Sequence, residues 1–241
     1  MFSRKDGGGE PGDKQFPEAL SKLKRQGASV LVVGPVRTEQ RRDVCQRLLG
    51  RATDRPRRRL LVSTTGDDDD VSHLLSDEFA ASNSFTHVSY ATHSRSATTS
   101  DSTSSPTGPS IPSAETSSTP VTTLADLGIA ISNAIETFET DANGLSPAEL
   151  RIGIDSLIPL LEAYGTERVF KFVHLTTGRT RESDGMIHYH LPMDHDADIV
   201  SVLEPLFDIT IELREHHGVF QERWTINDGD LRSGWVSIER S

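Results

Sequence analysis

Short apolar runs alternate with stretches of helical periodicity along most of the chain. Residues 29–33 (SVLVV) form a continuous apolar run, which is typical of a strand buried on both faces. Residues 16–26 instead carry Phe16, Leu20 and Leu23 at helical spacing. The same two patterns predict strands over 60–63, 85–90, 150–154, 186–191 and 209–213, and helices over 39–49, 71–81, 124–140, 166–179 and 197–206. Strands that alternate with helices predict an α/β fold with a mostly parallel central sheet flanked by helices.

A polar stretch interrupts this alternation in the middle of the chain. Residues 92–123 contain 19 Ser or Thr among 32 residues, together with four prolines, so few of their side chains can bury apolar area. The alternation resumes afterwards, and neither half has enough strands for a separate α/β domain. We therefore predict one domain over 16–241, interrupted by a flexible insertion at 92–123, and a disordered tail over 1–15.

The pattern changes at the end of the chain. Residues 219–226 and 234–239 alternate between apolar and polar side chains on either side of the turn sequence NDGD. This alternation predicts an antiparallel hairpin that extends one edge of the sheet.

Composition and charge narrow the function classes. The chain has 25 basic and 36 acidic residues, a net charge of −11, which argues against a generally basic surface for nucleic acid. A single cysteine excludes an intramolecular disulfide and any zinc site built from several cysteines. No apolar run approaches the ~18–20 residues that span a bilayer, and the first residues lack the apolar segment of a secretory signal. We therefore expect a cytoplasmic protein without membrane contact.

The turn after the first predicted strand lies where an ATPase would carry its phosphate-binding loop. Aligned on Gly34, the template G-x-x-x-x-G-K-[ST] requires glycine, lysine and a hydroxyl residue where this chain has Glu39, Gln40 and Arg41. The lysine charge and the magnesium-binding hydroxyl are both missing, and Glu39 would place a carboxylate against phosphate. We therefore do not expect an ordinary phosphate loop here.

Asp155 directly follows the predicted strand 150–154, in the sequence LRIGIDSLIPLL. A carboxylate in this place, followed here by Ser156, has the form of a Walker B element, which orients magnesium and its waters. The alternative is that Asp155 accepts hydrogen bonds from the backbone of the next turn. The pattern alone leaves both interpretations open.

Two histidines of the predicted strand 186–191 point to the same face of the sheet. His188 and His190, with Asp194 after the strand, supply imidazole and carboxylate groups, which are ligand types of zinc and other transition metals. However, side chains of a central strand face packed helices, and Asp194 precedes a predicted helix whose first turn it would cap. We therefore favour packing over metal binding, and we interpret Cys45 as a small packed hydrophobe.

Arginines are concentrated between residues 37 and 59, where they make up nine of 23 residues. In an acidic chain this stretch is the one candidate surface for an anion or an acidic partner. The candidate patch consists of Arg41, Arg42, Arg57, Arg58 and Arg59. The alternative is that exposed helix positions use arginine because this chain, with five lysines against 20 arginines, avoids lysine.

Several of these stretches together resemble a known family. RIGIDSLIPLL, GTERVFKFVHLTTGRTRESDG, MIHYHL and FDITIELRE resemble the C-terminal half of KaiC/RecA-like ATPase domains, and DLGIAISNAIETF is similar as well. The chain also resembles haloarchaeal KaiC/RecA-like proteins of unknown function with a degenerate Walker A loop. The resemblance implies a RecA/KaiC-like fold in which Asp155 matches the Walker B aspartate, and a retained nucleotide site would include Gly34, Thr38, Asp155 and Ser156.

We therefore predict a non-catalytic regulatory or signalling module in the cytoplasm of a halophilic archaeon. We expect it to need no cofactor and to bind protein partners, which include a second copy of the chain. We do not expect it to bind nucleic acid. The first alternative is an ATPase that binds ATP through an unorthodox phosphate loop and uses Asp155 for magnesium. The second alternative is a nucleic-acid binder that uses the arginines between 37 and 59.

Overall fold

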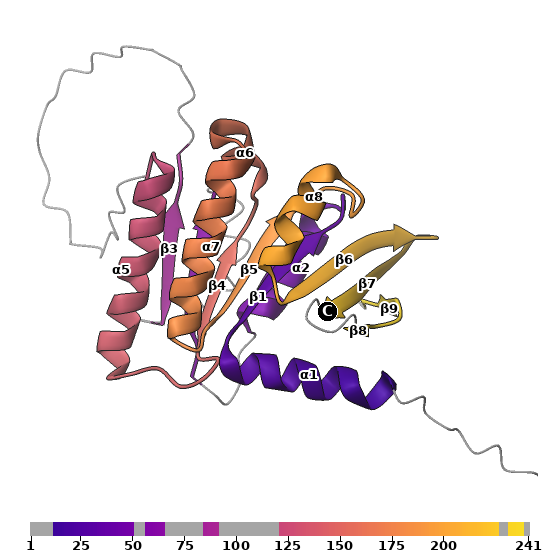
Figure 1. Ribbon diagram of the computed structural model, residues 1–241, viewed down its shortest axis with the longest axis horizontal. Helices are drawn as coiled ribbons and strands as arrows, with labels where there is room; N and C mark the ends of the chain where they lie inside the picture. The colour runs from indigo at the N-terminus through magenta and orange to yellow at the C-terminus, as the bar shows by residue number, and fades with distance from the viewer. Residues whose placement is uncertain (1–11, 51–55, 66–83, 92–120, 227–230, 239–241) are drawn as a thin grey trace, which may run out of the picture.

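The computed structural model describes residues 12–50, 56–65, 84–91, 121–226 and 231–238 (Figure 1). The predicted helix over 71–81, most of the predicted insertion and residues 1–11 of the predicted tail lie outside these ranges. Residues 12–15, which we also expected in the tail, belong to the first helix instead, so that helix begins four residues earlier than its apolar spacing indicated.

A nine-stranded sheet runs through the described part of the chain in the order β3-β2-β4-β5-β1-β6-β7-β8, with β9 paired to β7. The strands are β1 (Ala28–Val33), β2 (Arg58–Ser63), β3 (Phe85–Ser89), β4 (Leu150–Ile154), β5 (Met186–Leu191), β6 (Ile209–His216), β7 (Val219–Ile226), β8 (Leu231–Arg232) and β9 (Val236–Ser237). All pairings from β3 to β6 are parallel, and those of β7 with β6, β8 and β9 are antiparallel. The predicted α/β class, the mostly parallel sheet and the antiparallel C-terminal edge are confirmed.

Helices cover both faces of the sheet (Figure 1). They are α1 (Gly12–Gln26), α2 (Thr38–Leu49), α5 (Leu124–Ala142), α6 (Ile158–Tyr164), α7 (Thr166–Glu182) and α8 (Asp198–Leu203), which continues into the 3₁₀ turn η1 (Glu204–Leu206). The helices α5 to α8 pack on one face, whereas α2 packs on the other and α1 lies against β7 and β8. Short α6 was not predicted, and the helix expected over 197–206 ends its α-helical part at Leu203.

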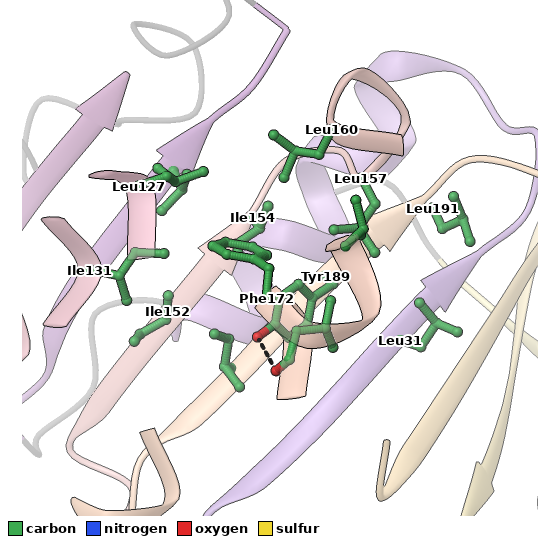
Figure 2. Close-up of a cluster of buried hydrophobic side chains, with 14 of the residues drawn as sticks. Leu31, Leu127, Ile131, Ile152, Ile154, Leu157, Leu160, Phe172, Tyr189 and Leu191 are labelled. Atoms are coloured by element: carbon green, nitrogen blue, oxygen red, sulfur yellow. Dashed lines mark hydrogen bonds between the residues drawn. The ribbon is translucent and has the colours of Figure 1, made fainter. Parts of the chain in front are cut away.

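The larger core lies between the sheet and α5–α8 (Figure 2). Leu31, Ile152 and Tyr189 are fully buried there. Each apolar side chain of this size contributes about 1.5–3 kcal/mol when it leaves water. The Tyr189 hydroxyl lies 2.6 Å from Thr176 Oγ1, so its polar atom is satisfied inside the core.

The side chains of β5 alternate between the face of the sheet covered by α5–α8 and the face covered by α2. Val30 of β1 lies opposite His188, and Val32 lies opposite His190. Because side chains alternate along a strand, Tyr189 points into the larger core while both histidines point towards α2. The strand pattern therefore places two imidazoles under a helix that follows β1.

The described residues just before and just after the segment 92–120 lie side by side. Tyr90 and Val121 form a parallel bridge at the β3 edge, in which the Ala91 N–H donates to the Val121 carbonyl at 2.9 Å. Thr123 Oγ1 then accepts the Asp126 N–H at 3.1 Å and caps α5. Residues 121–123 are thus part of the ordered fold, which corrects the C-terminal limit of the predicted flexible insertion.

Candidate functional site

Polar side chains gather where the parallel strands end. Asp155 follows β4, Thr64 and Thr65 follow β2, and His190 is the penultimate residue of β5. This carboxyl edge is where open parallel sheets usually bind their ligands. It is therefore the first place to look for a functional site.

Asp155 joins the ends of two neighbouring strands. Its Oδ1 accepts the Thr64 N–H at 2.8 Å, and its Oδ2 accepts the Thr65 hydroxyl at 3.0 Å. Burial raises the pKa of this carboxyl, and the threonine hydrogen bonds act in the opposite direction. Both carboxylate oxygens of Asp155 therefore hold the turn that follows β2. In this arrangement the carboxylate is neither a free ligand for magnesium nor a cap of the turn that follows Asp155.

Ser156 has a local structural role. Its hydroxyl oxygen accepts the Ile158 N–H at 3.2 Å, the first N–H of α6. The side chain itself is buried. Ser156 is thus accounted for by the start of a helix.

The turn between β1 and α2 is closed by its own contacts. The Gly34 N–H donates to the Met193 carbonyl at 2.8 Å, and a Cβ at Gly34 would lie 2.2 Å from the Leu213 carbonyl oxygen. The Arg37 N–H is accepted by the Gln40 side chain at 3.0 Å. Gly34 is therefore required by the close approach of β6, at a φ of 126°, and the turn does not present a ring of free N–H groups to a phosphate.

A small cavity lies between this turn and Asp155. Its volume is about 40 Å³, and its walls are Thr38, Arg41, Arg42, Cys45, Thr65, Asp155 and His190. We call this space the Asp155 cavity. A site that holds a nucleotide-sized ligand typically measures roughly 300–1,000 Å³. The Asp155 cavity can hold an ion or a few water molecules.

Beneath this cavity lies a buried cluster of three side chains. His188, His190 and Cys45 each place a potential ligand atom within 4.8 Å of the other two. Asp194, which we had grouped with the histidines, is exposed and not part of the cluster. The third member of the cluster is Cys45 instead. Cys45 lies one helical turn after Arg41 on α2, and both side chains border the cavity.

The candidate arginines do not form one surface. Arg41 and Arg42 line the Asp155 cavity, whereas Arg57 and Arg59 lie at the opposite end of the strands and donate to the carbonyls of Ala148 and Gly50 at 2.7 and 2.9 Å. Arg58 pairs with Glu149 at 3.7 Å. These internal contacts supply a structural reason for three of the five arginines.

A second candidate site lies on the opposite face of the sheet. An apolar groove of about 890 Å³ runs between α5 and α7. We call it the α5–α7 groove; it is lined by Thr123, Leu124, Ala125, Gly128, Ile129, Ser132, Asn133, Tyr164, Arg168, Lys171, Phe172, Leu175 and Thr176. Leu175 is 69% exposed and Ile129 is 57% exposed. Sequence periodicity did not single out this groove, because it places only the inward side of each helix.

Fold and site together define the class: an α/β domain with a mostly parallel sheet and a closed, polar carboxyl edge. The chain belongs to a family of unknown function, DUF7504, whose sequence pattern matches residues 27–213. That span runs from the residue before β1 into β6 and includes the Asp155 cavity and the α5–α7 groove. No curated protein matches the chain. Among the described helices, none is both long and apolar enough to cross a bilayer.

Proposed function

We propose that this domain is a RecA/KaiC-like module that acts by binding a protein partner and does not hydrolyse nucleotide. In this proposal it has a regulatory or signalling role in the cytoplasm of a halophilic archaeon. The observation that carries the proposal is the α5–α7 groove, an exposed apolar surface on a strongly acidic chain.

The carboxyl edge supports the non-catalytic part of the proposal. Asp155 is engaged by Thr64 and Thr65, and the cavity beside it measures about 40 Å³. Gln40 offers no ammonium group and Arg41 no hydroxyl for magnesium. Losing such charge stabilisation costs several kcal/mol of transition-state energy, so an ATPase role has little chemical support here.

The α5–α7 groove supports the binding part. Exposed side chains such as Ile129 and Leu175 would gain from leaving water. Gly128 lies in the interior of α5 and lines the groove, and a Cβ added there would meet no atom within 4 Å. A helix-interior glycine costs about 1 kcal/mol relative to alanine. Since the described part of the domain gives no packing reason for this glycine, close approach of a partner would account for it.

The occupant we propose is an amphipathic helix with acidic residues beside its apolar face. Two helices form the walls of the groove, and a third helix can lay its apolar stripe between them. Arg168 and Lys171 stand in the wall, and Arg168 has no ion pair with any described residue. Lys171 already pairs with Glu167 on α7 at 2.7 Å, so Arg168 is the cation that would face a carboxylate of the incoming helix.

A selection from a displayed library of helical peptides tests the proposal. Full-length protein in high salt should enrich amphipathic sequences with Asp or Glu beside the apolar stripe, and Ile129→Glu/Leu175→Glu should abolish the enrichment. Val202→Glu is the matched control, because Val202 is 46% exposed on α8, outside the groove. Equal enrichment on the groove variant would overturn the proposal, and so would self-association of the chain that Leu175→Glu removes.

Calorimetric titration with ATP and magnesium tests the other half. We expect no heat of binding and no turnover above background. Binding that Asp155→Asn abolishes would contradict this expectation and favour the ATPase alternative.

A further inference from the structure

Three potential metal ligands meet under α2 from two separate parts of the chain. Cys45 comes from α2, and His188 and His190 come from the central strand β5. All three side chains are at most 3% exposed. A buried cluster of one thiol and two imidazoles has a ligand set that suits zinc-class ions.

The distances approach those of a coordination sphere. Tetrahedral zinc, with Zn–S of about 2.3 Å and Zn–N of about 2.0–2.1 Å, separates its ligand atoms by roughly 3.3–3.6 Å. His188 Nε2 lies 3.3 Å from Cys45 Sγ, and all three ligand atoms lie within 4.8 Å of one another. The longest of these separations exceeds the tetrahedral value by about 1 Å, so side-chain movements of that size would complete the arrangement.

His190 is the strongest single indication. Both of its ring nitrogens are buried, and neither has a hydrogen-bond partner among the residues that the structure describes. Leaving a buried polar atom unpaired costs about 1–3 kcal/mol, so two such atoms on one imidazole call for an explanation. A metal ion bound to one of them would remove part of that cost.

Burial changes the protonation of all three side chains. Burial lowers the pKa of His190 to about 3, and burial lowers the pKa of His188 well below its usual range. Both imidazoles are therefore neutral, whereas burial raises the pKa of the Cys45 thiol, so that an ion has to displace the thiol proton. His188 also hydrogen-bonds the backbone of Ile152, a type of contact that orients a ligating imidazole.

We propose that Cys45, His188 and His190 bind one transition-metal ion of the zinc class, with the fourth coordination position facing the Asp155 cavity and taking a water molecule. Binding forms a metal–thiolate bond and releases the Cys45 proton to solvent. Arg41 and Arg42 both border the cavity, and their charges oppose a cation. The Cys45 thiolate and the Asp155 carboxylate supply two negative charges that offset the two arginines. The exposed residues Thr38 and Thr65 mark the route by which an ion would enter.

Titration of metal-free, full-length protein with Co²⁺ tests the site directly. We expect a cobalt–thiolate charge-transfer band that saturates at one ion per chain and is displaced by Zn²⁺. Cys45→Ala should abolish the band. His190→Gln should keep the band and weaken the Co²⁺ affinity by roughly tenfold or more. Substituting a group that only hydrogen-bonds a metal ligand already costs about that much.

Surface histidines provide the control. His216 and His217 are exposed neighbours, with ring centroids 4.1 Å apart, and are a place where an ion could bind adventitiously. The His216→Gln/His217→Gln variant should keep both the band and the stoichiometry.

A stability measurement covers the case in which a variant folds poorly. Zn²⁺ should raise the Tm of the wild type and of the surface variant, because it binds only the folded state, and should leave the Tm of His190→Gln much less changed. No cobalt–thiolate band in the folded wild type, or a band that survives Cys45→Ala, would overturn the proposal.

Discussion

Gly153 lies on β4 directly beside the imidazole of His188. A Cβ at this position would lie 2.7 Å from both Cε1 and Nε2 of that ring, and 3.4 Å from Cys45 Sγ. We expect Gly153→Ala to reduce the free energy of unfolding by about 1–3 kcal/mol, since the ring must move in a closely packed interior. Chemical denaturation measures the change.

A second substitution tests the cause of this loss. In a His188→Ala background the ring is absent, so Gly153→Ala should cost much less there than in the wild type. Such a difference between single and double variants is a coupling energy of contacting residues. Equal costs in both backgrounds would mean that the glycine serves another purpose.

Glu139 connects α5 to α7 by charge. Its carboxylate accepts hydrogen bonds from Arg179 at 2.6 and 3.2 Å, and from Ser183 at 2.6 Å. The negative charges of Glu136 and Glu182 also act on Arg179 and raise its pKa. The hydrogen bond from Arg179 lowers the pKa of Glu139 below its usual value of 4.5. The resulting stabilisation is present above the unfolded-state pKa and is lost as the pH falls through the folded-state pKa.

We therefore expect the stability of wild type to fall more steeply below about pH 5 than that of Glu139→Gln. At neutral pH the variant should lose under about 1 kcal/mol, because the pair is partly exposed. Urea denaturation at several pH values checks this, with Glu162→Gln on the exposed side of α6 as control. Parallel pH curves for wild type and Glu139→Gln would contradict the prediction.

The sequence could predict part of the buried cluster and not the rest. Strand periodicity alone placed His188 and His190 on one face. It could not supply Cys45, which is 143 residues away from His188, because that contact depends on strand order and on how α2 rotates above the sheet. The threonines that hold Asp155 were missed for the same reason, since β2 and β4 become neighbours only in the folded sheet.

At the scale of elements, Gly128 and Gly178 form a matched pair. Each lies inside a helix, and a Cβ at either position would meet no atom within 4 Å. Gly128 lines the α5–α7 groove, whereas Gly178 does not. We expect both Gly→Ala variants to gain up to about 1 kcal/mol of stability, since alanine favours the helix.

Only Gly128→Ala should affect peptide binding. A methyl group there would crowd the incoming helix at a cost of about 1–3 kcal/mol, a loss of roughly 5- to 150-fold in affinity. Fluorescence anisotropy with a selected peptide measures it. Unchanged affinity of Gly128→Ala would separate this glycine from the proposed interface.

Long helices and buried strands were predicted well, including β4 and β5 with their bounds, whereas the short α6 and the strand near the C-terminus were not. Leu127, Ile131, Ile135 and Phe138 recur at helical spacing over α5 and are all buried. By contrast, α6 has seven residues, too few for its periodicity to stand out, and it starts beside Pro159. Of the predicted strand over 234–239, the described residues 234–238 contain β9, Val236–Ser237, and β7 pairs with both β8 and β9.

At the scale of the whole molecule, the Tyr90–Val121 bridge explains how a long segment can leave and rejoin the sheet at one place. Deleting 96–119 leaves six residues, 91–95 and 120, to connect Tyr90 with Val121. We expect the Tm to stay nearly unchanged, because loop-closure entropy varies slowly with length. A calorimetric scan of full-length and shortened protein checks this. A collapse of folding would show that the removed segment contributes to the core.

The position of β1 has a consequence for how the protein is made. This strand lies between β5 and β6, so both of its partners are synthesised more than 150 residues later. At about 5–20 residues per second on the ribosome, β1 waits roughly 8 to 30 seconds before its first partner appears. During that time an apolar strand remains without its sheet, which makes the nascent chain a natural client for chaperones until its last third has emerged.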